Sequence, residues 1–582
     1  MSNRQQAAEA SLQDQENILP KKKLIVTFSV LAISYFTCFL DQNGIGQLLP
    51  TVARDLDATN TISWAAASAL IGNTTFQVLY GRLSDIFGRK VVYLSALGLL
   101  CFSDFMCGAS KTAPMLYLFR GLTGVAGGGI TSLSMIIVSD IVTLDQRGKY
   151  QGILSSMVGL GNLVGPLVAA EFAEIHYWRG LYWVVGPIAG LCGSVAWWFL
   201  PATPPMGPFK EQAKKIDYWG VITASIGVIF LLIPISGGGS YFQWRSAMVV
   251  SMLVIGGIFC GLFIYVELKV ARLPILPLSM FTNRPVAALL LQNFFFGMVL
   301  YTHIYALPLY FQNVREFSPI KSAMMVIPLV STQSIASILS GQYISHKKRY
   351  GEVIWLGFFL FTLGTCLTTL FDRTFPIYGI VLILIVLGIG NGNVFQPTIV
   401  ALQAHCSKSQ RAVVISARNF LRCLGGSVSL AVSAAIQQNV LKRQLPAKYN
   451  HLAAKTYARP DFSDYSPEDD ALVSEAYAKA SRAVFVFMTP CAGLCLLAMF
   501  LVKDRGLTRP EEVVKSEGVH RDEEDRNSPS VHEKRVLKQK QGSAHTSVEN
   551  SAKTSAETSD CETRRGNGKC GQLDGLSKKG CS

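Results

Sequence analysis

Long apolar runs separated by short polar segments dominate the chain. The runs are continuous rather than amphipathic, and each is long enough to cross a hydrocarbon core of roughly 30 Å. They are expected to be helical, because backbone groups in lipid must be satisfied within the segment. A β-barrel is excluded, because barrel strands are about half as long and alternate in polarity. The fourteen expected spans are 24–49, 62–80, 91–109, 114–138, 150–173, 180–200, 217–236, 246–267, 286–309, 321–344, 352–371, 376–401, 412–437 and 484–502.

The basic residues of the short loops predict the orientation of these spans. Sixteen Lys and Arg residues fall in one alternating set of short loops. The other set holds seven, namely Arg54, Lys111, Arg179, Arg245, Arg315, Lys321 and Arg373. The richer set is expected on the cytoplasmic side, which puts both termini in the cytoplasm. Residues 438–483 then form a long outer loop, and the polar segment 503–582 is expected to be a disordered cytoplasmic tail.

Composition supports a membrane protein and excludes several other classes. Only 16% of the 582 residues are charged, against about 25% in soluble proteins. The net charge of +15 comes from short basic clusters between apolar runs, without interleaved aromatics, so no nucleic-acid partner is expected. No Cys/His set has metal-ligand spacing, and no P-loop or Ser/His/Asp constellation is present. We therefore expect no metal, no cofactor and no enzymatic activity.

The sharpest local pattern lies in residues 81–90, between the second and third spans. Gly81 and Gly88 suit a tight reversal of the chain. Asp85 can accept hydrogen bonds from helix-start N–H groups, and Arg89 and Lys90 suit anionic lipid headgroups. The full spacing resembles the signature loop of the major facilitator superfamily, G-x-L-a-D-r-x-G-r-k.

Other segments resemble the same superfamily. Residues 40–41 and 50–56 look like the first-helix motif of its drug-exporting members, and residues 120–129 are similar to the fourth-helix motif. The fifth-helix "antiporter" motif is matched by Gly152, Gly161, Gly165 and Pro166. Residues 217–220, 274–277 and 281–285 look like linker pieces of the 14-spanner drug:proton antiporters, particularly fungal ones.

This resemblance implies a fold and a domain organisation. The chain would be an all-α polytopic membrane protein with two six-helix bundles, at 24–200 and 286–502, and two inserted helices within a linker at 201–285. Residues 1–23 would be a cytoplasmic N-terminal segment. Substrate would bind between the bundles near the midplane and be reached from alternating sides. Superfamily members generally work as single chains, which implies a monomer.

The function implied is export of small amphipathic molecules, such as drugs, toxins or secondary metabolites, in exchange for protons. The expected partners are thus a small-molecule substrate, protons and the lipid bilayer. The expected location is the plasma membrane. Two alternatives stay open: a vacuolar basic amino-acid transporter, and a transporter-like nutrient or metabolite sensor that signals through its tail.

Asp41 and Arg120 are the first candidates for proton coupling. A charge at the centre of a span costs roughly 2.5–3.5 kcal/mol, so such residues are functional suspects. Asp41 lies in the outer part of the first span and Arg120 in the outer part of the fourth, at similar depth, so the two can face each other. A proton arriving from outside would neutralise Asp41 and loosen the pair. The alternative is a fixed structural ion pair.

Further polar side chains lie within the spans. Arg418 and Arg422, four residues apart, share one face of the thirteenth span and can bind an anionic group or pair across helices. Amides at this density either line a wet cavity or act as helix–helix contacts, and His303 is either a second proton carrier or simply hydrogen-bonded to a neighbour. The candidate cavity residues are Gln42, Asn73, Gln77, Asn293, His303, Asn391, Gln396 and Arg418.

Overall fold

The computed structural model describes residues 5, 17–58, 61–62, 64–202, 210–211, 214–237, 243–406, 410–445, 467–504 and 506. The expected tail at 503–582 falls almost entirely outside these residues. So do most of segment 1–23 and the centre of the expected outer loop at 438–483. All the described residues belong to one compact unit.

Within the described residues the secondary structure is helical, with no strand. Thirteen of the helices are long and apolar enough to cross a membrane, so the chain is an all-α, multi-pass membrane protein. The long helices are α2 Lys21–Asp55, α3 Trp64–Phe87, α4 Arg89–Gly108, α5 Ala113–Ile141, α6 Leu144–Glu174, α7 Arg179–Phe199, α9 Tyr218–Gly237, α10 Ala247–Tyr265, α11 Arg284–Asn313, α12 Pro319–Lys347, α13 Gly351–Thr368, α14 Ile377–Phe395, α16 Arg411–Gln444 and α17 Pro467–Ala498.

Helix α3 is the one expected span that is not among the thirteen. It is 24 residues long and helical throughout, but Asn73, Thr74, Thr75 and Gln77 lower its mean hydropathy. All four side chains are buried, and α3 packs along α5. The polar residues therefore lie inside the protein and away from lipid, which is where polar groups in a membrane helix are expected.

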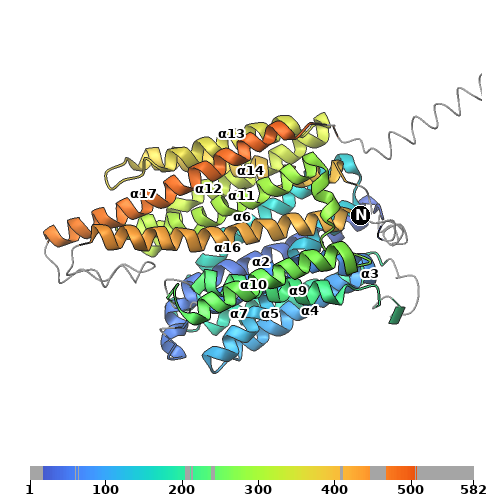
Figure 1. The fold of residues 1–582 in the computed structure, drawn as a ribbon, viewed down its shortest axis with the longest axis horizontal. Helices are drawn as coiled ribbons and strands as arrows, with labels where there is room; N and C mark the ends of the chain where they lie inside the picture. Colours follow the sequence, from blue (N-terminus) through green and yellow to red (C-terminus); the bar gives the residue numbers. More distant parts are fainter. Residues whose placement is uncertain are drawn as a thin grey trace, which may run out of the picture. The chain divides into compact units, whose positions relative to one another are not determined.

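The helices form two groups. Helices α2 to α7 contact one another, as do helices α11 to α17, while α9 and α10 form a pair that touches α3 and α16. Figure 1 shows α11, α12, α13, α14 and α17 running side by side, and α2, α4, α5 and α7 together below them. This is the arrangement of two bundles with an inserted pair. The boundaries 24–200, 201–285 and 286–502 remain our proposal.

The structure differs from the expected spans at two places. The span 376–401 is broken into α14 and α15 (Pro397–Ala404). The break lies at Pro397, which has no N–H and therefore removes one hydrogen bond of the helix. In addition, α16 runs on to Gln444 and α17 already begins at Pro467. Helix thus occupies both ends of the expected outer loop, at 438–444 and 467–483. A helix can continue beyond the membrane, because outside lipid its residues need not be apolar.

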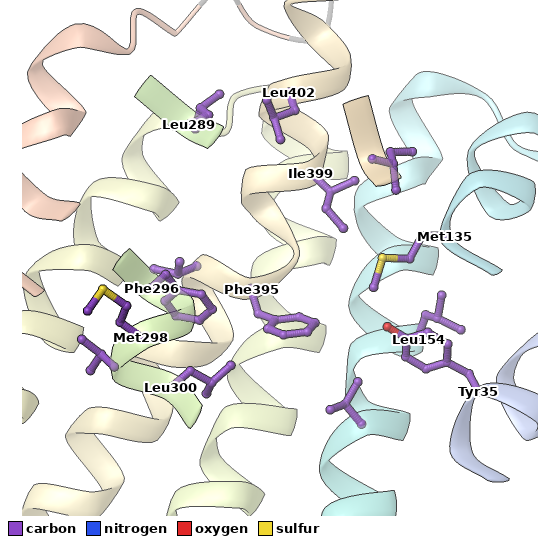
Figure 2. Packing of buried hydrophobic residues seen from close by; sticks show 14 of the residues in the cluster. Tyr35, Met135, Leu154, Leu289, Phe296, Met298, Leu300, Phe395, Ile399 and Leu402 are labelled. Carbon is purple, nitrogen blue, oxygen red and sulfur yellow. The ribbon is translucent and has the colours of Figure 1, made fainter. Parts of the chain in front are cut away.

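An aromatic cluster packs around the break in the second bundle. The Phe296 ring of α11 lies 5.1 Å from the ring of Phe361 and 6.3 Å from that of Phe395. Figure 2 shows Phe395 pointing from α14 toward the helices that carry Met135 and Leu154. Aromatic pairs at these separations add about 0.5–1.5 kcal/mol each beyond their burial. Phe395 is therefore held firmly at the contact between the bundles.

Candidate functional site

Asp41 of α2 and Arg120 of α5 form a buried ion pair. Nη1 of Arg120 donates to both carboxylate oxygens of Asp41, at 2.7 and 2.8 Å. The two residues are only 2% and 1% exposed. At this depth, removing either partner would leave an uncompensated charge, which typically costs 3–5 kcal/mol. Whatever changes the charge of Asp41 will therefore act strongly on Arg120.

A second carboxylate lies near this pair. Asp104 of α4 is fully buried, and neither of its side-chain oxygens has a hydrogen-bond partner. It is close enough to interact electrostatically with Asp41 and Arg120. The Arg120 guanidinium also lies 5.9 Å from the centre of the Tyr182 ring. Two acids and one guanidinium thus share this part of the first bundle.

A cavity of about 360 Å³ lies between the bundles, beside the ion pair. Its size falls within the range of small-molecule sites, roughly 300–1,000 Å³. Side chains from both bundles line it, including Arg120 and Asn162 from the first bundle and His303, Asn391 and Arg422 from the second. Among the described residues, its lining contains no Asp or Glu. Most of the remaining wall is apolar.

The sequence-predicted cavity residues divide into two groups. Gln42, Asn73, His303 and Asn391 line the cavity, whereas Gln77, Asn293, Gln396 and Arg418 do not. Gln77 instead donates to Thr131 Oγ1 across the α3–α5 contact, at 3.2 Å. Asn293 donates to the Leu289 carbonyl one turn earlier. Gln77 thus serves the contact between helices. The His303 ring stacks on the Phe485 ring, with 6.5 Å between the two ring centres.

Arg418 is committed to the break after α14. The N–H of Ile399 donates to the Gln396 carbonyl, so the Phe395 carbonyl lacks its helical donor. Nη2 of Arg418 donates to that carbonyl and to Thr398 Oγ1, while Nη1 donates to Asn419 Oδ1. An unsatisfied buried carbonyl costs about 1–3 kcal/mol. Arg418 thereby stabilises the broken helix.

The signature loop is mostly helical. Only Gly88 separates α3 from α4, with φ of +88°, a conformation that favours glycine. Asp85, still within α3, contacts Arg89 at 2.6 Å rather than helix-start N–H groups. Arg89 also bonds Asp140 of α5 at 2.9 Å. The expectation that Arg89 suits lipid headgroups is therefore wrong, because two buried carboxylates neutralise it, while Lys90 is half-buried beside it.

Contacts between the bundles close the end of the molecule that carries this loop. Asp140 binds Arg411, the first residue of α16, at 2.8 Å, and Arg411 also donates to the Ser139 carbonyl. Gly81 lies against the Ala412 backbone of the same helix. Nearby, the Lys149 N–H of α6 donates to Ser345 Oγ of α12. The motif thus ties one bundle to the other.

The antiporter-motif glycines lie where α6 meets its neighbours. A Cβ on Gly161 would lie 2.6 Å from the Phe39 Cβ, and one on Gly165 would lie 2.7 Å from the Leu40 carbonyl oxygen, both in α2. Gly152 faces the Ser337 carbonyl of α12 in the same way. Pro166 lines the cavity. This stripe therefore brings α2 close to α6 immediately beside Asp41.

Replacing Gly165 with Ala should lower the melting temperature of the purified protein. The added methyl group meets backbone rather than a flexible side chain, and overpacking of this kind costs about 1–3 kcal/mol. Gly98→Ala is the matched control, because nothing lies within 4 Å of a Cβ at that position. A thermal-shift measurement in detergent checks this. Equal melting temperatures for the two variants would contradict the close α2–α6 contact.

Comparison with known families agrees with this architecture. The model of the family described as "Major Facilitator Superfamily" matches residues 31–430, which is more than half of the chain. The chain belongs to the Major Facilitator Superfamily. The signature loop and the antiporter motif lie within the matched region. The residues that line the inter-bundle cavity also come from it.

Its relatives are fungal transporters of this superfamily. The chain is 45% identical to "Citrate exporter 1" of Yarrowia lipolytica over 507 residues, covering 86% of this chain and 75% of the relative. It is 42% identical to "MFS-type transporter clz4" of Cochliobolus lunatus over 505 residues, covering 86% and 90%. It is 29% identical to "Efflux pump dotC" of Dothistroma septosporum over 504 residues, covering 85% and 87%.

A solved structure supports the fold assignment. The superfamily's proton:xylose symporter XylE matches with a TM-score of 0.55 over 85% of this chain and 99% of the symporter. Sequence identity is only 14%, so the likeness extends to the fold and no further. The prediction of a major facilitator fold is confirmed.

Asp104 and Arg422 are two residues whose individual importance was not inferred from the sequence. Asp104 sits within an apolar run, and an intramembrane carboxylate is a functional suspect by default; that rule alone would have found it in the sequence. The sequence alone makes Arg418 and Arg422 equivalent, because both lie on one face of the same span. The structure separates them, because Arg418 serves the helix break while Arg422 reaches the cavity.

Proposed function

We propose that the chain exports small amphipathic molecules across a membrane in exchange for protons. The supporting observation is the buried Asp41–Arg120 ion pair, whose arginine forms part of the wall of the inter-bundle cavity. A proton or a substrate in the cavity can reach Arg120, and through Arg120 it can influence Asp41. Coupling requires a group that responds both to the proton and to the substrate, and we assign this role to the Asp41–Arg120 pair.

The coupling step follows from the charges. Protonation of Asp41 removes the negative charge that holds Arg120, and a buried guanidinium without its counter-charge is unfavourable. In this scheme Asp104, which interacts electrostatically with Arg120, is protonated while Asp41 holds Arg120. After Asp41 takes up a proton, Asp104 releases its own proton toward the cytoplasmic side when the protein opens there, and becomes the counter-ion of Arg120. When Arg120 leaves Asp41, the part of the cavity wall that Arg120 forms also changes. Proton binding and substrate release are thereby linked.

The residues that line the cavity support an outward-facing conformation. Leu49 of α2, Gln312 of α11 and Ala323 of α12 line it, and all three lie near the helix ends opposite the signature loop. The signature-loop end is closed by Asp140 and Arg411. With the signature loop in the cytoplasm, this is a conformation that faces outward, ready to accept a proton from outside and release substrate there.

Export, rather than uptake of basic amino acids, is favoured by two observations. The names of two relatives state export, namely "Citrate exporter 1" and "Efflux pump dotC". The cavity lining contains no Asp or Glu among its described residues, whereas a cationic amino acid would need an acidic partner. We place the protein in the plasma membrane, with both termini cytoplasmic.

Proteoliposomes test this function. The purified chain is reconstituted, an amphipathic panel of cationic, neutral and anionic fluorescent molecules is loaded inside, and the outside is acidified. We expect at least one molecule to leave faster with the proton gradient than after a protonophore collapses it. Acidification of the lumen should accompany that movement. Efflux that ignores the protonophore, or proceeds without proton entry, would contradict proton exchange.

Asp104→Asn should slow this coupled efflux. Asparagine keeps the size of the side chain but cannot release a proton, so the relay from Asp41 is lost. We expect the gradient-driven rate to fall by roughly tenfold or more, while exchange of substrate between equal solutions continues. Ser103→Ala, on the adjacent position, is the control. An unchanged gradient-driven rate in Asp104→Asn would remove Asp104 from the proton path.

A further inference from the structure

Arg422 is an unusual residue for a membrane interior. It is 2% exposed, lies in α16 and forms part of the cavity wall. Its Nε and Nη1 have no hydrogen-bond partner. The guanidinium carbon lies 4.6 Å from the centre of the Phe395 ring, a cation–π contact that fixes the group but uses none of its N–H donors. Two of the three guanidinium nitrogens are therefore left without a hydrogen-bond partner in the protein.

The charge of Arg422 is not balanced by the protein. Three other poorly exposed arginines have acidic partners: Arg120 has Asp41, and Arg89 and Arg411 share Asp140. Within the described part of the chain, Arg422 forms no such pair. Its neighbour one turn earlier is Arg418, whose guanidinium approaches the same Phe395 ring at 5.1 Å. Two positive charges therefore lie together, beside a cavity without an acidic wall.

An anion in the cavity would resolve this imbalance. Burying an unpaired charge is costly, and a guanidinium presents a planar fork of donors that matches a carboxylate in two parallel hydrogen bonds. Gln333 and Asn391 add polar groups to the same wall. The rest of the lining, including Phe39 and Ile327, is apolar and suits a hydrocarbon part.

We propose that the cavity binds an organic anion through a carboxylate held by Arg422. Arg418 reinforces the positive potential while remaining bound to the helix break. This inference rests on the proposed export function, because it names the substrate class of that same cavity. It narrows amphipathic molecules to those that carry at least one carboxylate, and it explains why the second bundle concentrates positive charge at this point.

Binding measured on the purified full chain tests the inference. The probes are citrate, hexanoate and hexyltrimethylammonium; the last two match in chain length and differ in the charge of the headgroup. We expect calorimetry to detect citrate or hexanoate and not the cation. In Arg422→Gln, affinity for the carboxylate should fall on the order of 30-fold or more, and Arg422→Lys should recover only part of it because lysine lacks the fork.

Arg443→Gln is the matched control. It removes one positive charge from the same helix at an exposed position outside this cavity, so carboxylate affinity should stay at the native value. Equal weakening in Arg422→Gln and Arg443→Gln would reduce the effect to general electrostatics and overturn the site. Thermal-shift curves of the apo variants show whether each one is folded.

The outcomes separate this inference from the proposed function. Gradient-driven efflux of a cationic or neutral molecule, together with no carboxylate binding by the native chain, overturns the anion site and leaves proton-coupled export standing. Carboxylate binding that depends on Arg422, together with no gradient-driven movement of any molecule, supports the anion site and overturns proton exchange. Carboxylate affinity that is equal in native and Arg422→Gln proteins overturns the inference directly.

Discussion

Asp41→Asn is expected to abolish proton-driven export while leaving gradient-independent exchange of substrate. Asparagine fills the same space but cannot bind and release a proton, so the charge on which Arg120 depends never changes. We expect the gradient-driven rate in proteoliposomes to fall by about 100-fold or more. Exchange between equal substrate solutions needs no net proton movement and should persist.

The stability of this variant is measured separately. Removing one member of a buried pair typically costs 3–5 kcal/mol, so Asp41→Asn alone should melt at a lower temperature than the native chain. The double variant Asp41→Asn/Arg120→Gln removes both charges and should recover much of that loss, yet still fail to couple. Coupled efflux by the double variant would show that the pair is a structural contact and the proton site lies elsewhere.

Asp55→Asn provides a matched control on the same helix. Asp55 also pairs with an arginine, Arg179, at 2.8 Å, but that pair is substantially exposed. Hydrogen bonds from the Trp178 indole and from Arg179 hold the pKa of Asp55 below its usual range. This carboxylate therefore stays ionised through mildly acidic pH and cannot serve as a proton carrier there. Coupled efflux should be unchanged in Asp55→Asn.

Much of the fold could be predicted from the sequence, because a lipid core imposes one length and one secondary structure on every span. The helix positions follow directly from the apolar runs. The sequence predicted the ends of helices less well where those ends do not coincide with the ends of apolar runs. The break at Pro397 falls inside a continuous apolar run, and α17 begins 17 residues before its expected span, at Pro467. Proline geometry and helix propensity, not hydropathy, set these ends.

The site was predictable only in part. The pairing of Asp41 with Arg120 followed from equal depth and opposite charge. The roles of the amides did not, because they depend on the rotation of each helix about its axis. Gln77 faces a neighbouring helix, while Asn73, four residues earlier, lines the cavity. The difference between Arg418 and Arg422 likewise depends on a carbonyl freed by the helix break, which no sequence spacing reveals.

Asp140→Asn is expected to loosen the closed end of the protein. Asp140 is buried and accepts from Arg89 in its own bundle and from Arg411 in the other. Asparagine can accept only weaker, uncharged hydrogen bonds, so two buried guanidiniums lose their shared counter-charge. The cost for this conformation should be about 3–5 kcal/mol, and the bundles should separate there more often. The variant should therefore populate states open at the signature-loop end.

Hydrogen–deuterium exchange measures this opening without added labels. Backbone amides in residues 411–417, at the start of α16, should exchange faster in Asp140→Asn, by about 150-fold or more if the full 3–5 kcal/mol falls on the closed state. Glu316→Gln is the control: its ion pair with Arg373 is exposed at the opposite end, and exposed pairs contribute only about 0–1 kcal/mol. Faster exchange confined to residues 411–417 in Asp140→Asn, with coupled efflux reduced, would mean that closure at this end is needed to hold the outward-facing cavity. Unchanged exchange would mean that the α6–α12 contact closes that end without Asp140.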